Sequence, residues 1–187
     1  MNRHGLIGGA TGTGKTKSLQ IIAEQLSLKG VPTLLMDIKG DLSGIGAAAN
    51  TDDKNATERM QALNLPFDPQ ASPVELLSIS DEPGARLRAT VEDFGPILFG
   101  TIAPASLGAI LRKIVGLEQQ GASKFFGEPS FDVQDLLKTR DGKGIVNIIR
   151  LVDVQNQPNL FSTFMLSLLN KIYSEFPEAG DSDKPKL

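Results

Sequence analysis

The chain has 187 residues, 40% of them hydrophobic and 22% charged, which is the composition of a single globular domain. It has no cysteine and one histidine, so disulfides, thiolate metal sites and histidine-cluster metal sites are excluded. The formal net charge of −3 gives no overall basic surface for nucleic acid. No apolar run reaches the roughly 18 residues of a membrane-spanning helix, and no signal-peptide pattern is present. We therefore expect a cytoplasmic protein without a membrane partner.

The first predicted element is a short apolar strand over residues 4–7, which leads into a glycine-rich loop. Residues 8–16 read Gly-Gly-Ala-Thr-Gly-Thr-Gly-Lys-Thr and fit the P-loop pattern G-x-x-x-x-G-K-[ST]. Glycine lets the backbone adopt positive φ and approach phosphate groups closely. The residues predicted to bind a nucleotide are Gly9, Ala10, Thr11, Gly12, Thr13, Gly14, Lys15, Thr16 and Lys17.

A helix is predicted next, over residues 17–28, where apolar side chains recur at helical spacing and Gly30 follows as a stop signal. Strand, glycine loop and helix in this order are the context that a P-loop requires, which disfavours a chance glycine-rich turn. The free N–H groups at the start of the helix attract phosphate. We expect Lys15 to contact the β- and γ-phosphates as a catalytic residue, and the Thr16 hydroxyl to bind Mg²⁺.

The second predicted strand, over residues 31–38, is apolar and follows the helix through a tight turn, as a βαβ unit requires. It ends in Asp37-Ile38-Lys39-Gly40-Asp41. Ligands of open α/β sheets bind at the carboxyl ends of the strands, so Asp37 is a predicted Mg²⁺ ligand and Asp41 a predicted catalytic acid that positions water. The alternative is an ordinary solvated loop after a strand.

The next segments have weaker signals. Residues 39–56 are typical of a mobile loop, and residues 57–63 of a short amphipathic helix. Residues 74–79 and 86–91 read as two strands around a Pro-Gly turn, and they predict a hairpin beside the main sheet. Arg86 and Arg88 share one face of the second strand, a pattern more typical of a solvated face than of a phosphate or partner contact.

The remaining chain alternates helices with one core strand. Helices are predicted over residues 104–120, 132–138 and 158–176, and a buried strand over residues 144–151. No apolar run ends in Asp-Glu, the Walker B signature in which Asp orients Mg²⁺ and Glu activates water. The nearest candidate is Asp153, but Arg150 interrupts its apolar run, and an Asp after a strand is commonly a helix cap. The sequence thus indicates nucleotide binding more clearly than hydrolysis.

Taken together, these segments resemble the bacterial HerA-like ATPases of the HerA/FtsK group. The resemblance covers nearly the whole chain and rests on residues 2–16, the Asp37–Ser43 segment, Ser106–Ile110, Phe125–Pro129 and Asp183–Leu187. It implies an α/β P-loop NTPase (RecA-like) fold with a mainly parallel sheet flanked by helices. It also implies ATP and Mg²⁺ as cofactors, a homo-oligomeric ring that is often hexameric, and DNA as a partner of the full-length protein. By the same resemblance, Lys15 and Thr16 take the P-loop roles, and Asp37 and Asp41 lie near the nucleotide.

Two departures from the family pattern lead us to expect a trimmed form, a single and incomplete nucleotide-binding domain over residues 1–187. In relatives, a Lys-Pro-Lys-Leu segment like residues 184–187 continues directly into the Walker B strand. Relatives also carry a helical segment where this chain has only Gly100-Thr101, so residues 99–102 read as a splice.

The expected function is therefore the ATP-binding domain of a HerA-like DNA helicase or translocase, with weak or absent hydrolysis by this chain alone. A nucleotide-binding or assembly module without turnover is the alternative. A small-molecule kinase is less consistent with the sequence, because no arginine cluster typical of a kinase lid is visible.

Overall fold

The computed structural model describes residues 4–88, 104–119, 121–127, 131–176, 185 and 187. These residues contain a four-stranded sheet in the order β1-β6-β2-β3, in which every neighbouring pair is parallel. The strands are β1 (Thr33–Asp37), β2 (Val74–Ser78), β3 (Ala85–Arg86) and β6 (Val146–Arg150). The prediction of an α/β fold with a parallel sheet flanked by helices is confirmed.

Four of the five described α-helices form close to where the apolar spacing predicts them. The helices are α1 (Lys15–Leu28), α2 (Lys54–Ala62), α3 (Pro104–Gln119), α4 (Ala122–Phe125) and α5 (Pro158–Glu175). Two 3₁₀ segments, η1 (Ser43–Gly46) and η3 (Val133–Leu137), and a small antiparallel pair, β4 (Thr139–Arg140) with β5 (Lys143–Gly144), complete the described elements. The helices predicted at 104–120 and 158–176 are each confirmed to within a residue, and the segment predicted at 132–138 is a 3₁₀ rather than an α-helix.

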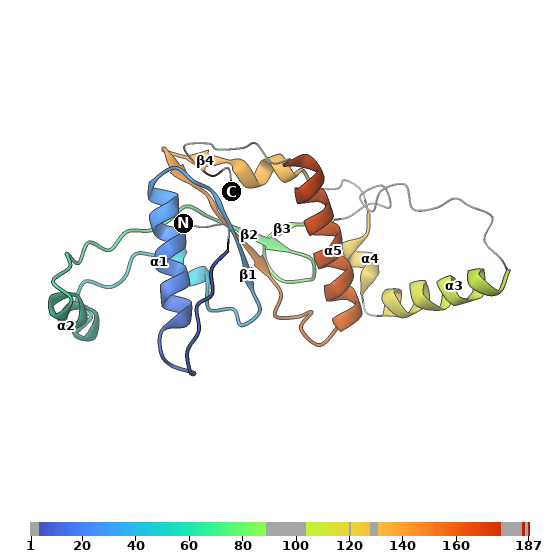
Figure 1. The fold of residues 1–187 in the computed structure, drawn as a ribbon, viewed down its shortest axis with the longest axis horizontal. Helices are drawn as coiled ribbons and strands as arrows, with labels where there is room; N and C mark the ends of the chain where they lie inside the picture. The colour runs from blue at the N-terminus through green and yellow to red at the C-terminus, as the bar shows by residue number, and fades with distance from the viewer. Residues whose placement is uncertain (1–3, 89–103, 120, 128–130, 177–184, 186) are drawn as a thin grey trace.

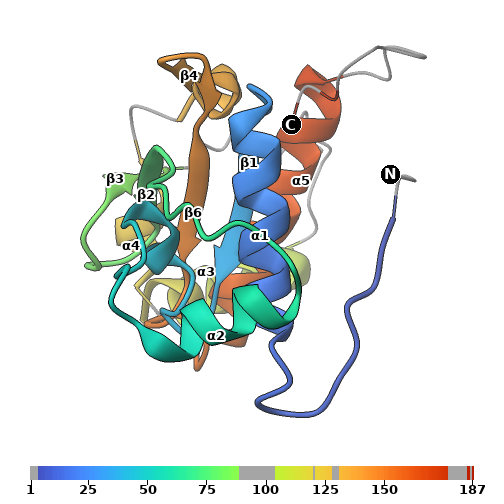
Figure 2. The ribbon, with the colours of Figure 1, turned by 90° about the vertical axis from the view of Figure 1, so that its left-hand side faces the viewer.

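Helices α1 and α5 lie on opposite faces of the sheet (Figures 1 and 2). On one face, Ala23 of α1 packs with Leu35 and Ile148 of the sheet. On the other, Phe164 of α5 packs with Ile149 and with the segments around α4 and η3. Successive side chains of β6 point to opposite faces of the sheet, and both faces are covered, so nearly all of them are buried. This explains why the strand reads as an almost continuous apolar run.

Two side-chain hydrogen bonds fix the direction of α1 against the sheet. Near the start of the helix, Gln20 Nε2 donates to the carbonyl of Asp41, just beyond the end of β1, at 3.0 Å. Near its end, Ser27 Oγ donates to the carbonyl of Gly144, just before β6, at 2.5 Å. The helix therefore runs antiparallel to the strands, and its N-terminus lies at their carboxyl ends (Figure 1).

The predicted strand over residues 4–7 is wrong. These residues have no regular structure and are exposed, and the Leu6 side chain is 95% accessible to solvent. A lone strand needs neighbours to satisfy its backbone, and this run is short and bounded by Gly5, Gly8 and Gly9, which are entropically costly to hold extended. The two apolar side chains, Leu6 and Ile7, therefore do not suffice to add a strand to the sheet.

The predicted hairpin is also wrong. β3 pairs parallel to β2, with Leu77 opposite Ala85. The connection after β2 therefore carries the chain back along that strand before β3 begins. Gly84 makes this return possible: its φ is +153°, and a Cβ there would lie 2.7 Å from the Leu76 carbonyl oxygen. Of the rest of the predicted second strand, residues 87 and 88 have no regular structure, and residues 89–91 lie outside the described residues.

The segment between β1 and β2 has more structure than a mobile loop. Leu42 and Ile45 are buried against α1 and the sheet, and η1 lies between residues 43 and 46. Helix α2 begins at Lys54, three residues before the predicted start, because the Asp53 side chain caps it by accepting from two backbone N–H groups. The proposed splice at residues 99–102 lies outside the described residues. Among the residues that are described, no helix is long and apolar enough to cross a membrane.

Candidate functional site

The glycine loop, residues 8–14, forms a turn that ends at Gly14, directly before the first residue of α1. Gly12 and Gly14 have φ angles of +81° and +90°, in the left-handed region that favours glycine. Gly14 is the N-cap of α1, and no side chain caps the helix. The loop residues up to Gly14 are exposed, whereas Lys15 and Thr16 are half-buried and Lys17 is exposed.

The first turn of α1 presents free backbone donors. Ser18 N–H donates to the Gly14 carbonyl at 2.9 Å, but within the described residues the N–H groups of Lys15, Thr16 and Lys17 have no acceptor. Three unpaired donors at the N-terminus of a 14-residue helix, where the helix dipole is positive, make a favourable position for an anion. This is the arrangement that the sequence pattern predicts.

Inside the loop, one carbonyl oxygen gathers the polar side chains. The Ala10 carbonyl accepts from Lys15 Nζ at 2.5 Å and from Thr13 Oγ1 at 2.8 Å. The Lys15 ammonium is thus folded back over the loop, where it neutralises the carbonyl end of one peptide dipole. A side chain at Gly9 would place its Cβ 2.6 Å from Thr13 Oγ1, so glycine allows this close turn.

Asp37, at the end of β1, is only 2% exposed and has four backbone donors. Its Oδ1 accepts from Gly40 N–H at 2.7 Å and more weakly from Lys39 and Asp41, and its Oδ2 accepts from Leu42 N–H at 3.1 Å. The carboxylate therefore fixes the turn after β1. Both oxygens thus accept backbone hydrogen bonds, three on Oδ1 and one on Oδ2, which favours this structural role over direct binding of a metal.

Asp41 lies in the same turn with its side chain exposed, and its backbone carbonyl is the acceptor for Gln20 of α1. This contact brings the Asp37–Asp41 turn and the start of α1 to one edge of the sheet, as the sequence predicts. No group of three or more His, Cys, Asp and Glu side chains suited to a metal is present among the described residues.

A row of polar side chains crosses the carboxyl edge of the sheet. The strand register places Asp37 beside Arg150, and Arg150 beside Ser78. Arg150 Nε lies 2.7 Å from Oε2 of Glu82, a carboxylate from the loop after β2 that is only 6% exposed. Glu82 has no local sequence signal, and Arg150 appeared in the sequence only as an interruption of an apolar run.

Asp153, the nearest sequence candidate for a Walker B acid, follows β6 in the same region. Its Oδ2 accepts from Ser80 Oγ at 3.2 Å, and its backbone N–H donates to Glu82 Oε1 at 3.0 Å. Asp153 thus takes part in the hydrogen bonds that join the loops after β2 and β6.

Asp81 lies in the loop after β2. Hydrogen bonding by the Lys124 ammonium lowers the pKa of this exposed carboxylate.

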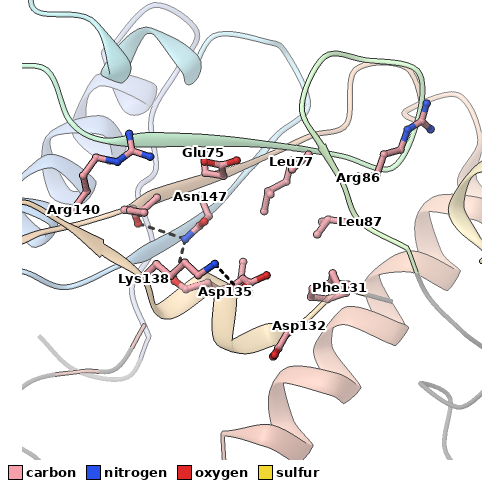
Figure 3. Close-up of a pocket in the computed structure, with 13 residues that line it drawn as sticks. Glu75, Leu77, Arg86, Leu87, Phe131, Asp132, Asp135, Lys138, Arg140 and Asn147 are labelled. Carbon is pink, nitrogen blue, oxygen red and sulfur yellow. Dashed lines mark hydrogen bonds and ion pairs between the residues drawn. The ribbon is translucent and has the colours of Figure 1, made fainter. Parts of the chain in front are cut away.

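One cavity lies elsewhere in the described part of the chain. It has a volume of about 310 Å³ and is lined by Leu77 of β2, Asn147 of β6 and side chains around η3. The Asn147 side-chain amide donates to the carbonyl of Leu136 in η3, and Lys138 forms an ion pair with Asp135 (Figure 3). Because Leu77 belongs to the apolar cluster on the α5 side, the cavity is on the face of the sheet opposite α1 and contains none of the predicted nucleotide-binding residues.

Comparison with known proteins gives one family. The model of that family, described as Helicase HerA-like C-terminal, matches residues 1–102 and residues 98–187. No curated protein and no solved structure matches the chain. The two matches together span the whole sequence, including the glycine loop, the Asp37–Asp41 turn and Arg150. The chain belongs to the family of helicase HerA-like C-terminal domains.

Proposed function

We propose that the chain is the ATP-binding domain of a HerA-like DNA helicase or translocase, with a P-loop NTPase (RecA-like) fold. The observation that carries the proposal is the start of α1. There a glycine loop with two left-handed glycines leads into three backbone N–H groups without acceptors, at the carboxyl edge of a parallel sheet. Both features serve phosphate binding in α/β proteins.

The loop residues fit a nucleotide. The glycines leave the loop without bulky side chains, so its backbone can follow the phosphates, and the N–H groups of Lys15, Thr16 and Lys17 would donate to them. Lys15 now bonds to the Ala10 carbonyl. In the proposal it exchanges this neutral acceptor for the β- and γ-phosphates, with which it makes stronger, charge-assisted hydrogen bonds.

Mg²⁺ fits the site with fewer protein ligands than the two that the sequence predicts. Thr16 supplies a half-buried hydroxyl at the first turn of α1, and a magnesium ion commonly keeps several waters beside the phosphates of its nucleotide. Asp37 remains a predicted ligand, but its oxygens would have to give up backbone donors. When bound, the ion would neutralise charge on the phosphates.

We further propose that this chain alone binds ATP and hydrolyses it slowly or not at all. An acid that activates water must be near the phosphates and able to accept a proton. In the described residues the carboxylates of Asp37, Glu82 and Asp153 at this edge all have internal partners. Asp41 is exposed and is the remaining predicted catalytic acid. The proposed role is therefore nucleotide binding, as in the alternative of an assembly module.

Assembly and DNA binding belong to the same proposal. The family suggests a ring-shaped homo-oligomer and DNA as partner of the full-length protein, and light scattering with and without ATP tests whether this chain assembles.

The separate matches that overlap at residues 98–102 support a splice near residues 99–102. Intact mass of the natural gene product would contradict the splice if it equals that of this chain.

The test is nucleotide binding and turnover on one sample, measured by calorimetry and by phosphate release with Mg·ATP, with and without DNA. We compare Lys15→Ala with Lys29→Ala, which removes an exposed lysine at the other end of α1. Loss of charge-assisted bonds predicts about 10- to 100-fold weaker binding for Lys15→Ala and no change for Lys29→Ala.

Equal binding by the two variants would overturn the nucleotide site. Multiple turnover that depends on Lys15 would leave the binding site intact but overturn the proposal of slow hydrolysis. In that case Asp41 and Asp153 would be the acids to substitute next.

A further inference from the structure

We propose that Arg150 recognises the terminal phosphate of the bound nucleotide. In the absence of a triphosphate, Arg150 forms its ion pair with Glu82 at the edge of the sheet. The inference rests on the proposed nucleotide site and adds to it a residue that distinguishes ATP from ADP.

Arg150 points to the face of the sheet that α1 covers. Side chains two residues apart on a strand share a face, and Ile148 packs in the apolar cluster with Ala23 of α1. Arg150 and its register partner Asp37 therefore lie on the α1 side, at the carboxyl ends of neighbouring strands.

The start of α1 reaches the same level. Leu19 of α1 and Leu35 of β1 belong to one cluster. Asp37 lies beyond Leu35 by about 7 Å of strand. Lys15 lies before Leu19 by about 6 Å of helix, in the same direction because α1 runs antiparallel to β1. The row of Asp37 and Arg150 is thus level with the first turn of α1, where the phosphates would bind.

The ion pair leaves Arg150 free to bind a second anion. The contact with Glu82 is made through Nε, which lies 2.7 Å from Glu82 Oε2. The terminal nitrogens of Arg150 donate to none of the described residues, and the side chain is 27% exposed. A guanidinium fork of this kind suits bidentate recognition of a phosphate.

The neighbouring carboxylate does not compete for Arg150. The oxygens of Asp37 accept four backbone N–H groups, which already compensate its charge. Glu82 is anchored separately, because its Oε1 accepts from Asp153 N–H at 3.0 Å. Arg150 can therefore move from Glu82 to a phosphate while the rest of the edge keeps its hydrogen bonds. A triphosphate, with more negative charge than a diphosphate, would draw it over more strongly.

The experiment measures dissociation constants for a non-hydrolysable ATP analogue and for ADP, each with Mg²⁺. The variants are Arg150→Ala and Glu82→Gln, with Arg140→Ala as the matched control, an exposed arginine of β4 that lines the cavity on the opposite face. Thermal unfolding of each variant reports whether it is folded.

We expect Arg150→Ala to weaken the ATP analogue about 10-fold or more and ADP by less than about threefold. Glu82→Gln should strengthen the ATP analogue, because it releases Arg150, and Arg140→Ala should change neither constant. A merely structural Arg150 would weaken both nucleotides alike or neither, and that result overturns the inference. Failure of Lys15→Ala to weaken either nucleotide would instead overturn the nucleotide site itself.

Discussion

At the carboxyl edge of the sheet, some side chains have structural roles that their residue types do not reveal. Asp37 is the clearest example: an acid at the end of a strand reads as a metal ligand, but its two oxygens accept four backbone N–H groups of the turn that follows. The same side chain thus serves to organise the loop beside the glycine loop. Sequence spacing cannot separate these roles, because both place an acid after a buried strand.

Asp37→Asn tests the structural role. An amide keeps the shape but replaces one acceptor oxygen by a donor, which would face the N–H of Leu42 or Gly40. We expect the free energy of unfolding in urea to fall by about 1–3 kcal/mol, the cost of a buried donor left unpaired. Asp52→Asn, at an exposed acid in the same connection, should change it by less than about 0.5 kcal/mol.

The outcome also decides between the two roles of this residue. If Asp37→Asn leaves the stability unchanged but abolishes the dependence of nucleotide binding on Mg²⁺, the residue is a metal ligand, and the structural assignment is wrong.

At the level of elements, the sequence predicts those whose signal is local. Strand β6 and helix α5 form as expected, because an apolar run between turns and a long amphipathic repeat each determine their own conformation. Residues 4–7 show the opposite: their apolar side chains suit a strand, but a strand exists only beside a partner. The parallel pairing of β3 depends on the close approach of Gly84 to Leu76, which no periodicity reveals.

One contact between elements is close enough to test by adding a single methyl group. Gly144 of β5 packs against the backbone before β1, and a Cβ there would lie 2.1 Å from the carbonyl carbon of Val31 and 2.4 Å from Pro32 N. Backbone atoms cannot move aside as a side chain can. Gly144→Ala should therefore lower the free energy of unfolding by about 1–3 kcal/mol or more.

The control for this prediction is Gly44→Ala, in η1, where a Cβ meets no atom within 4 Å. Its free energy of unfolding, measured in the same urea titration, should lie within about 0.5 kcal/mol of the parent value. Equal effects of the two substitutions would mean that the close approach at Gly144 is not maintained in solution.

For the molecule as a whole, the sheet separates two apolar clusters. One packs α1 against the sheet beside the proposed nucleotide edge, and the other joins α5, α4 and η3 to the opposite face. The sequence predicts that both faces are covered, since the segment of β6 is largely apolar. It does not predict the pair of Glu82 and Arg150, because residues so far apart in the chain meet only through the order of the strands.

The second cluster depends on Phe164, a fully buried residue of α5 whose ring meets that of Phe125 edge to face at 5.5 Å. Phe164→Ala removes this packing and leaves a cavity, so we expect the free energy of unfolding to fall by about 3–5 kcal/mol. Leu166→Ala, on the exposed side of the same helix, should cost less than about 0.5 kcal/mol. A small loss for Phe164→Ala, measured by urea denaturation, would show that α5 is not packed as described.

The hydrogen bonds of Asp37 have a consequence for the entropy of ligand binding. The turn at residues 38–42 is already ordered by its carboxylate, so a ligand at this edge need not restrict it further. Residues 4–9, by contrast, make no hydrogen bond to other described residues, and fixing a backbone costs about 1–2 kcal/mol per residue. Any part of this N-terminal segment that a phosphate ligand fixes would therefore add to the cost of binding. Because the Asp37 turn is held by its own hydrogen bonds and the approach to the glycine loop is not, the entropic cost of ligand binding would fall mainly on that approach.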